Sequence, residues 1–118
     1  MNQIRISENF RLNEFECRDG SHQVALRHEL LDKLQQLREE AARPVIITSG
    51  YRNPAHNRAV GGSPTSRHLT GEAADIRIPG LHPDEVAQLA AAAGFTGIGI
   101  YPGFTHVDIR PVPARWRG

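Results

Sequence analysis

Apolar side chains recur every three or four positions in the first third of the chain, on an otherwise polar background. They are Leu26, Leu30, Leu34, Leu37 and Ala41. This spacing gathers them on one face of a helix, and the proline at position 44 disfavours helical backbone just before it. The pattern therefore predicts an amphipathic helix over Gln23–Ala42.

Residues 73–78 and 105–110 alternate between polar and apolar side chains, which is the period of a half-buried strand. Asp75 falls on the polar face of the first strand, and His106 and Asp108 fall together on the polar face of the second. If the two strands are neighbours in a sheet, these polar side chains can meet at one point.

Weaker signals place the remaining elements. A β-branched run between a proline and a glycine favours a short buried strand, and prolines and glycines between the other runs favour turns. The elements we expect are a strand at Val45–Thr48, a short helix at Pro54–Val60, a helix at His82–Ala93 and a strand at Gly97–Tyr101. Helices placed before and between strands with short turns predict an α+β fold, a small and mainly antiparallel sheet with flanking helices.

Composition sets the scale of the domain. At 118 residues the chain is expected to form a single domain over residues 1–118. The formal net charge is +1, from 14 Lys and Arg against 13 Asp and Glu, so there is no global electrostatic footprint for nucleic acid. The one cysteine, Cys17, excludes an internal disulfide and a zinc motif built on cysteine pairs. We expect a monomer.

Targeting signals are not evident in the chain. No apolar run approaches the roughly 20 residues that a membrane span needs. Residues 1–8 lack the apolar segment of a signal peptide. We therefore expect no membrane span and no signal peptide in the chain as given, although a chain whose export signal had been removed would look the same.

Two short segments carry the candidate chemistry, Ser66–Asp75 (SRHLTGEAAD) and Thr105–Asp108 (THVD). Zinc prefers neutral imidazole nitrogen and carboxylate oxygen, and a catalytic zinc site uses three such ligands and keeps a fourth position for water. His68, Asp75 and His106 meet that need. The sequence therefore predicts a zinc site and, with it, a small metallohydrolase.

Several segments, taken in order, also resemble a known family. They are Ser49–Pro54 (SGYRNP), Asn57 with Val60–Gly62, Ser66–Asp75 with its pattern SxHxxGxAxD, and His106–Asp108 (HVD). Over most of its length the chain is similar to the zinc D-Ala-D-Ala carboxypeptidase family of peptidoglycan peptidases, a peptidase M15-like group related in fold to the hedgehog signalling domain. The HVD segment most resembles that of murein endopeptidases and phage endolysins.

The resemblance implies roles for individual residues. It makes the three candidate ligands a Zn²⁺ site, Arg52 a residue that binds a substrate carboxylate or carbonyl, and Ser66 a hydrogen-bonding support. The planar guanidinium fork suits such a carboxylate, which peptidoglycan stem peptides supply. Tyr51 and Tyr101 are candidates for lining the cleft, although aromatic residues beside strands more often belong to a core.

One position departs from the family pattern. Many relatives carry a general-base glutamate three positions before the last histidine ligand, where this chain has Gly103. Two roles then stand open for Asp108: general base, or acceptor of a hydrogen bond that orients a ligand imidazole. Glu72 is a weaker candidate for the base.

Three functions remain to be separated. The first is hydrolysis of amide bonds in stem peptides or cross-links at the bacterial cell wall, periplasmic or phage-delivered, with D,D, L,D and L-Ala-D-Glu bonds all open. The second is a non-catalytic cell-wall or protein-binding module with a structural zinc, which Gly103 favours. The third is nucleic-acid binding through Arg110, Arg115 and Arg117 around Trp116, but a solvated C-terminal tail explains these residues equally.

Overall fold

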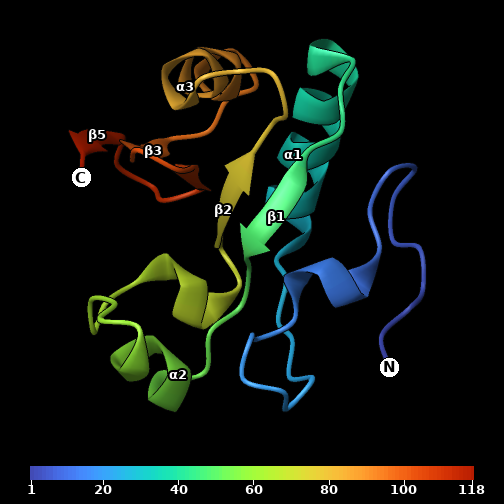
Figure 1. The fold of residues 1–118 in the computed structure, drawn as a ribbon, viewed down its shortest axis with the longest axis vertical. Coiled ribbons are helices and arrows are strands. Elements are labelled where there is room, and N and C mark those ends of the chain that lie inside the picture. Colours follow the sequence, from blue (N-terminus) through green and yellow to red (C-terminus); the bar gives the residue numbers. More distant parts are fainter.

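Five short strands form one sheet at the centre of the computed structural model, which describes residues 1–118 (Figure 1). The strands are β1 (Ile46–Ser49), β2 (Ala73–Arg77), β3 (Gly97–Ile100), β4 (Thr105–Asp108) and β5 (Ala114–Arg117). Their order is β1-β2-β4-β3-β5, and every neighbouring pair is antiparallel except β3 and β5, which are parallel. The predicted α+β class with a mainly antiparallel sheet is confirmed.

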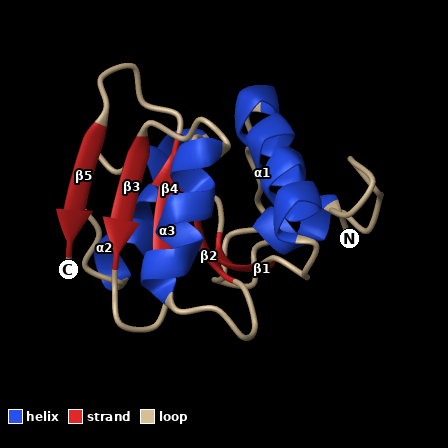
Figure 2. Ribbon diagram, turned by 90° about the horizontal axis from the view of Figure 1, so that it is seen from above, coloured by secondary structure: helices blue, strands red, loops and turns tan.

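Helices and helical turns surround this sheet. They are the 3-10 turn η1 (Leu12–Phe15), the helix α1 (His28–Ala41), the helix α2 (Pro54–Ala59), the 3-10 turn η2 (Arg67–Thr70) and the helix α3 (Pro83–Ala92). Helix α3 packs on β3 and β4, and α1 lies beside it (Figure 2). Figure 1 shows α2 at the end of the molecule opposite α3. None of the helices combines the length and the apolar character needed to cross a bilayer.

The apolar core lies between one face of the sheet and the helices α1 and α3. Its members include Leu30, Leu34 and Leu37 of α1, Ile76, Ile98 and Val107 of the sheet, and Val86 and Ala90 of α3. Alternation along each strand sends these apolar side chains to the core and leaves the opposite face to the polar residues. That opposite face carries the candidate chemistry.

The helix predicted at Gln23–Ala42 begins five residues later than expected, at His28. The amide of Arg27 donates to the carbonyl oxygen of Gly71 at 2.9 Å, so the chain before the helix is held against the turn that leads into β2. Gly71 has φ +72°, and a Cβ on it would collide with the main chain of Ala25. Tertiary contact with this turn therefore overrides the helical preference of the segment.

The C-terminal segment is not the solvated tail that its arginines favoured. Residues 114–117 form β5, which pairs with β3 and places Trp116 opposite Gly99. The side chain of Arg117 pairs with that of Asp84 at 3.0 Å. The sequence Ala-Arg-Trp-Arg does alternate with the period of a strand, but two arginines in four residues obscure the signal.

Candidate metal centre

A row of directly opposed residues crosses all five strands on the polar face of the sheet. The strand register pairs Ser49 with Asp75, Asp75 with His106, His106 with Gly99, and Gly99 with Trp116. Directly opposed residues on neighbouring strands point to the same face. The register of the sheet thus brings together residues that are far apart in the sequence.

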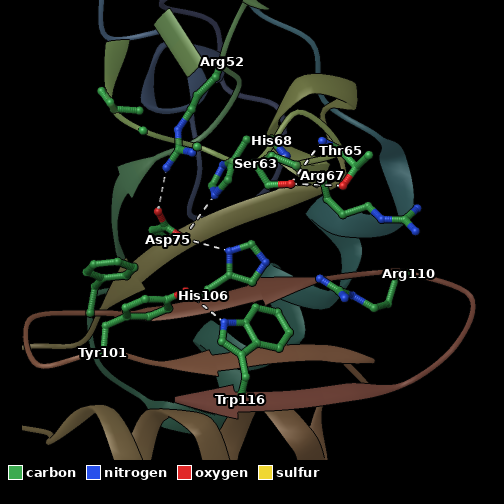
Figure 3. A pocket seen from close by; sticks show the side chains of 15 residues that line it. Arg52, Ser63, Thr65, Arg67, His68, Asp75, Tyr101, His106, Arg110 and Trp116 are labelled. Atoms are coloured by element: carbon green, nitrogen blue, oxygen red, sulfur yellow. Dashed lines mark hydrogen bonds and ion pairs between the residues drawn. The ribbon is translucent and has the colours of Figure 1, made fainter. Parts of the chain in front are cut away.

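Three side chains converge at the middle of this row (Figure 3). Nε2 of His68 lies 3.2 Å and Nδ1 of His106 lies 3.0 Å from Oδ1 of Asp75. The candidate ligand atoms all lie within 4.8 Å of one another. The three residues predicted as ligands therefore meet, with His68 supplied by η2 and the other two by β2 and β4.

Each imidazole uses its second ring nitrogen to reach a fixed acceptor. Nδ1 of His68 lies 2.7 Å from the carbonyl oxygen of Gly50, and Nε2 of His106 lies 2.8 Å from Oδ2 of Asp108. A protonated ring nitrogen donates in both bonds, so in the neutral form of each imidazole the nitrogen that faces Asp75 carries no proton and can bind a metal. This donor set, oriented in this way, fits a zinc ion.

Arg52 holds the other oxygen of Asp75. Its Nη2 donates to Oδ2 of Asp75 at 3.2 Å, its Nη1 donates to Oδ1 of Asn57 at 3.2 Å, and its Nε donates to Oγ of Ser49 at 3.3 Å. A guanidinium has five N–H groups, so two remain for other acceptors. Arg52 lines the cavity, and it combines the structural ion pair with this remaining capacity to donate.

Burial and hydrogen bonding oppose each other in this cluster. Burial raises the pKa of Asp75, but hydrogen bonds from His106 and His68 outweigh it and hold that pKa well below its usual range. Burial lowers the pKa of His106, but its bonds to Asp108 and Asp75 raise that pKa overall. The metal-free site therefore favours the protonated form of His106, and a metal that binds this histidine must displace that proton.

Asp108 is fully buried, and both of its oxygens have partners. Besides the bond to His106, Nε of Arg110 donates to Oδ1 at 2.9 Å and Nη2 of Arg110 donates to Oδ2 at 2.6 Å. Burial raises the pKa of Asp108, but the bonds from His106 and Arg110 hold it well below its usual range. Asp108 does not line the cavity. This geometry matches the orienting role rather than that of a general base.

The remaining sequence candidates lie at different places. Ser66 lines the cavity, and its Oγ accepts a hydrogen bond from the amide of His68 at 3.2 Å. Tyr51 is not among the residues that line the cavity, and its amide donates a 2.9 Å hydrogen bond to the carbonyl oxygen of Phe15. Glu72 is also outside the cavity and accepts from the hydroxyl of Thr70.

Gly103 lies exposed in the turn between β3 and β4, with open space where a Cβ would be. It does not line the cavity of the metal centre. Asp75 is the one carboxylate that does. The site therefore offers no free carboxylate for the general-base role that the resemblance assigned to a glutamate at the position of Gly103.

The candidate metal centre opens into a cavity of about 540 Å³. One wall is polar and comes from the loop and turn at 61–67, with Ser63, Thr65 and Arg67 (Figure 3). The opposite wall is aromatic and is formed by Tyr101, Phe104 and Trp116. Phe104 and Trp116 were not predicted as site residues from the sequence.

A signal for the aromatic wall was present in the sequence of β3, Gly97-Ile98-Gly99-Ile100. Alternation places the two isoleucines on one face and the two glycines on the other. The site-facing side of β3 therefore carries no side chains, which leaves space for side chains from the neighbouring strands. A Cβ on Gly97 would collide with the carboxylate of Asp108, and a Cβ on Gly99 would collide with the indole of Trp116.

Comparison with known proteins adds sequence evidence to this geometry. A sequence model described as Peptidase M15 matches residues 8–108. The chain is 37% identical over 82 residues to the zinc D-Ala-D-Ala carboxypeptidase of Streptomyces albus G, covering 64% of this chain and 32% of that protein. It is 32% identical over 91 residues to the peptidoglycan L,D-endopeptidase MepK of Escherichia coli K12, covering 70% of this chain and 50% of that protein.

A third relative is the probable peptidoglycan L,D-endopeptidase MepK of Haemophilus influenzae, 34% identical over 81 residues, which cover 63% of this chain and 43% of that protein. The chain thus spans half or less of the length of these curated relatives. The match to the family model covers more of this chain than the matches to the individual relatives, and it contains all three candidate ligands. The chain therefore belongs to the Peptidase M15 family.

Proposed function

We propose that this chain is a zinc-dependent peptidoglycan peptidase that hydrolyses amide bonds of stem peptides or cross-links at the bacterial cell wall. The observation that carries the proposal is the convergence of His68, Asp75 and His106 in an open cavity, with the second nitrogen of each imidazole held by a fixed acceptor. The relatives named as a zinc carboxypeptidase and as peptidoglycan endopeptidases support the substrate class.

Zinc bound here would polarise the scissile carbonyl and lower the pKa of a water molecule to about 7. The protein's own residues prepare the site for that chemistry. Asp108 and the carbonyl of Gly50 fix the tautomers of the two histidines. Arg52 holds Oδ2 of Asp75 and keeps two N–H groups for a substrate carboxylate or carbonyl. Ser66 keeps η2, and with it His68, in place.

Digestion of purified sacculi tests the proposal. Zinc-loaded wild-type protein should release muropeptides whose masses identify the bond that is cut. His68→Ala removes a ligand and should slow release by about 1000-fold, because metal-ion catalysis contributes several kcal/mol. Sacculi left intact by wild-type protein that carries one equivalent of zinc would overturn the enzymatic function.

A second function has one observation in its favour, the lack of a free carboxylate in the cavity apart from Asp75. On this reading the domain binds the cell wall, and the zinc is structural. Zinc-loaded protein that sediments with sacculi and releases nothing from them would support this function over hydrolysis.

A further inference from the structure

Tyr101 and Trp116 meet in the aromatic wall of the cavity (Figure 3). Nε1 of Trp116 donates a hydrogen bond to the hydroxyl oxygen of Tyr101 at 2.9 Å. An indole N–H can only donate, so the tyrosine oxygen is the acceptor and its own proton is left for another group. The Tyr101 ring also stacks on Phe104, with centroids 4.5 Å apart and an angle of 9° between the planes. The hydroxyl is therefore fixed in position while its proton remains unused.

Strand β3 is shaped to admit the indole of Trp116. Gly99 lies between His106 and Trp116 in the five-strand row. Neighbouring strands are about 4.8 Å apart, so residues two strands apart are separated by about 10 Å along the sheet. The rings of His106 and Trp116 nevertheless lie only 5.2 Å apart, because the indole occupies the space that a Gly99 side chain would fill.

Arg110 contacts the same indole. Its guanidinium carbon lies 4.7 Å from the centroid of the Trp116 ring. The same guanidinium is bonded to Asp108, which in turn accepts from His106. Trp116 is thus in contact with His106, a candidate metal ligand, and with Arg110. Strand β5 is therefore part of the site, although it lies beyond the residues 8–108 that match the family.

We propose that β5 completes the catalytic cavity, with Trp116 positioning the Tyr101 hydroxyl so that its O–H group donates a hydrogen bond to the carbonyl oxygen of the scissile amide. This inference rests on the proposed function. Negative charge grows on that oxygen as the amide is attacked, so a fixed donor stabilises the transition state more than the ground state. Arg52 and Arg110 also keep N–H groups that their bonds to Ser49, Asn57, Asp75 and Asp108 do not use, and Tyr101 adds to these cations a neutral donor whose oxygen is already held by Trp116.

The hydrogen bond can be tested without any turnover. Trp116 is the one tryptophan of the chain, so the protein has a single indole N–H resonance. Tyr101→Phe removes the acceptor but keeps the ring that stacks on Phe104. The resonance should shift upfield and its proton should exchange faster with solvent. An unchanged resonance would overturn the positioning of Tyr101 by Trp116.

Kinetics on a stem-peptide substrate test the use of the hydroxyl. Tyr101→Phe should lower kcat by about 10- to 100-fold with little change in KM, as expected for a transition-state donor. Trp116→Phe keeps an aromatic ring beside His106 but removes the N–H, and should lower kcat by about 10-fold without changing zinc affinity. Tyr51→Phe, a tyrosine outside the cavity, is the matched control and should leave kcat unchanged.

The double variant decides whether the two residues act together. If Trp116 acts through the hydroxyl, Tyr101→Phe combined with Trp116→Phe should be no slower than Tyr101→Phe alone. Effects that multiply, or a single Tyr101→Phe variant with wild-type kcat, would overturn this inference while the proposed function stands. Intact sacculi after treatment with wild-type protein would overturn both.

Discussion

The two faces of the central sheet follow different rules, although the same strands supply both. On the core face Ile76, Ile98 and Val107 pack against α1 and α3, and they need to be apolar and of suitable volume. On the opposite face Asp75 and His106 are buried as polar groups, and each depends on specific partners. The core face tolerates exchange of one apolar residue for another, whereas the site face depends on particular atoms at particular places.

Neighbouring residues of β3 allow the two faces to be tested separately. Ile98 belongs to the core cluster, and Gly99 lies opposite His106 on the site face. A substitution of Ile98 should change the stability of the protein without changing the site. A substitution of Gly99 should change the site and have a smaller effect on stability.

The largest expected effect is on the core face. Ile98→Ala removes a side chain that is 2% exposed, and should lower the free energy of unfolding by about 2–4 kcal/mol through lost burial and the cavity left behind. Chemical denaturation measures this loss. Zinc affinity and kcat of the folded protein should stay at wild-type values, and a large fall in either would mean that the two faces are coupled.

Substitution of Asp108 tests the buried support on the site face. Asp108→Asn should weaken zinc binding by about 10- to 100-fold, the usual cost of losing a group that orients a metal ligand. Competition with a chelator measures that affinity, and kcat at saturating zinc should stay close to wild type. Loss of turnover with zinc fully retained would instead make Asp108 the general base.

A smaller effect is expected where glycine leaves room for an indole. Gly99→Ala should displace Trp116, lower the free energy of unfolding by about 1–2 kcal/mol through overpacking, and alter the fluorescence of the single tryptophan. Gly103→Ala is the matched control, because a Cβ there meets open space. Equal stability and fluorescence for the two variants would contradict the steric account of β3.

The smallest expected effect is a dependence of stability on pH. The pKa of His106 is higher in the folded, metal-free protein than in the unfolded chain, so protonation of His106 stabilises the fold. This stabilisation is fully present when the pH is below the unfolded pKa of about 6.5, and it is lost as the pH rises through the folded pKa. Asp75 and Asp108 have lowered pKa values, so their contribution is present above about pH 4 and is lost only at more acidic pH.

Zinc should reverse the direction of this pH dependence. The ion binds neutral imidazole, so its stabilising effect grows as pH rises and protons compete less. Thermal unfolding between about pH 6 and pH 8, with zinc and with a chelator, should therefore give slopes of opposite sign for the contribution of the site. Parallel curves would contradict a metal site at His106.

The sequence predicted the parts of the molecule that depend on short-range patterns. Alternation placed Asp75 and His106 on polar strand faces, and the structure brings them together with His68. The α+β class followed from the order of helices and strands. The predicted start of α1 was wrong, because the true start depends on a contact between Arg27 and Gly71 that no local pattern reveals.

The parts that were missed depend on pairing between distant segments. Trp116 enters the site only because β5 lies parallel to β3, and a short strand rich in arginine gives little sign of that partner. The sequence left two roles open for Asp108, because the bidentate contact with Arg110, which favours the orienting role, joins side chains whose geometry no sequence pattern reveals. Tyr51 and Tyr101 were both candidates for lining the cleft, yet only Tyr101 lines the cavity.

From the row that crosses five strands we expect the site to form late in folding. His68 and Asp75 are close in the sequence, but His106 joins them only when β2 and β4 pair, a non-local contact that forms slowly. A metal that needs all three ligands would bind after the main barrier has been crossed. It would then stabilise the native state more than the transition state, so its chief kinetic effect would be slower unfolding rather than faster folding. Metal loading would thus mainly prolong the lifetime of the folded domain.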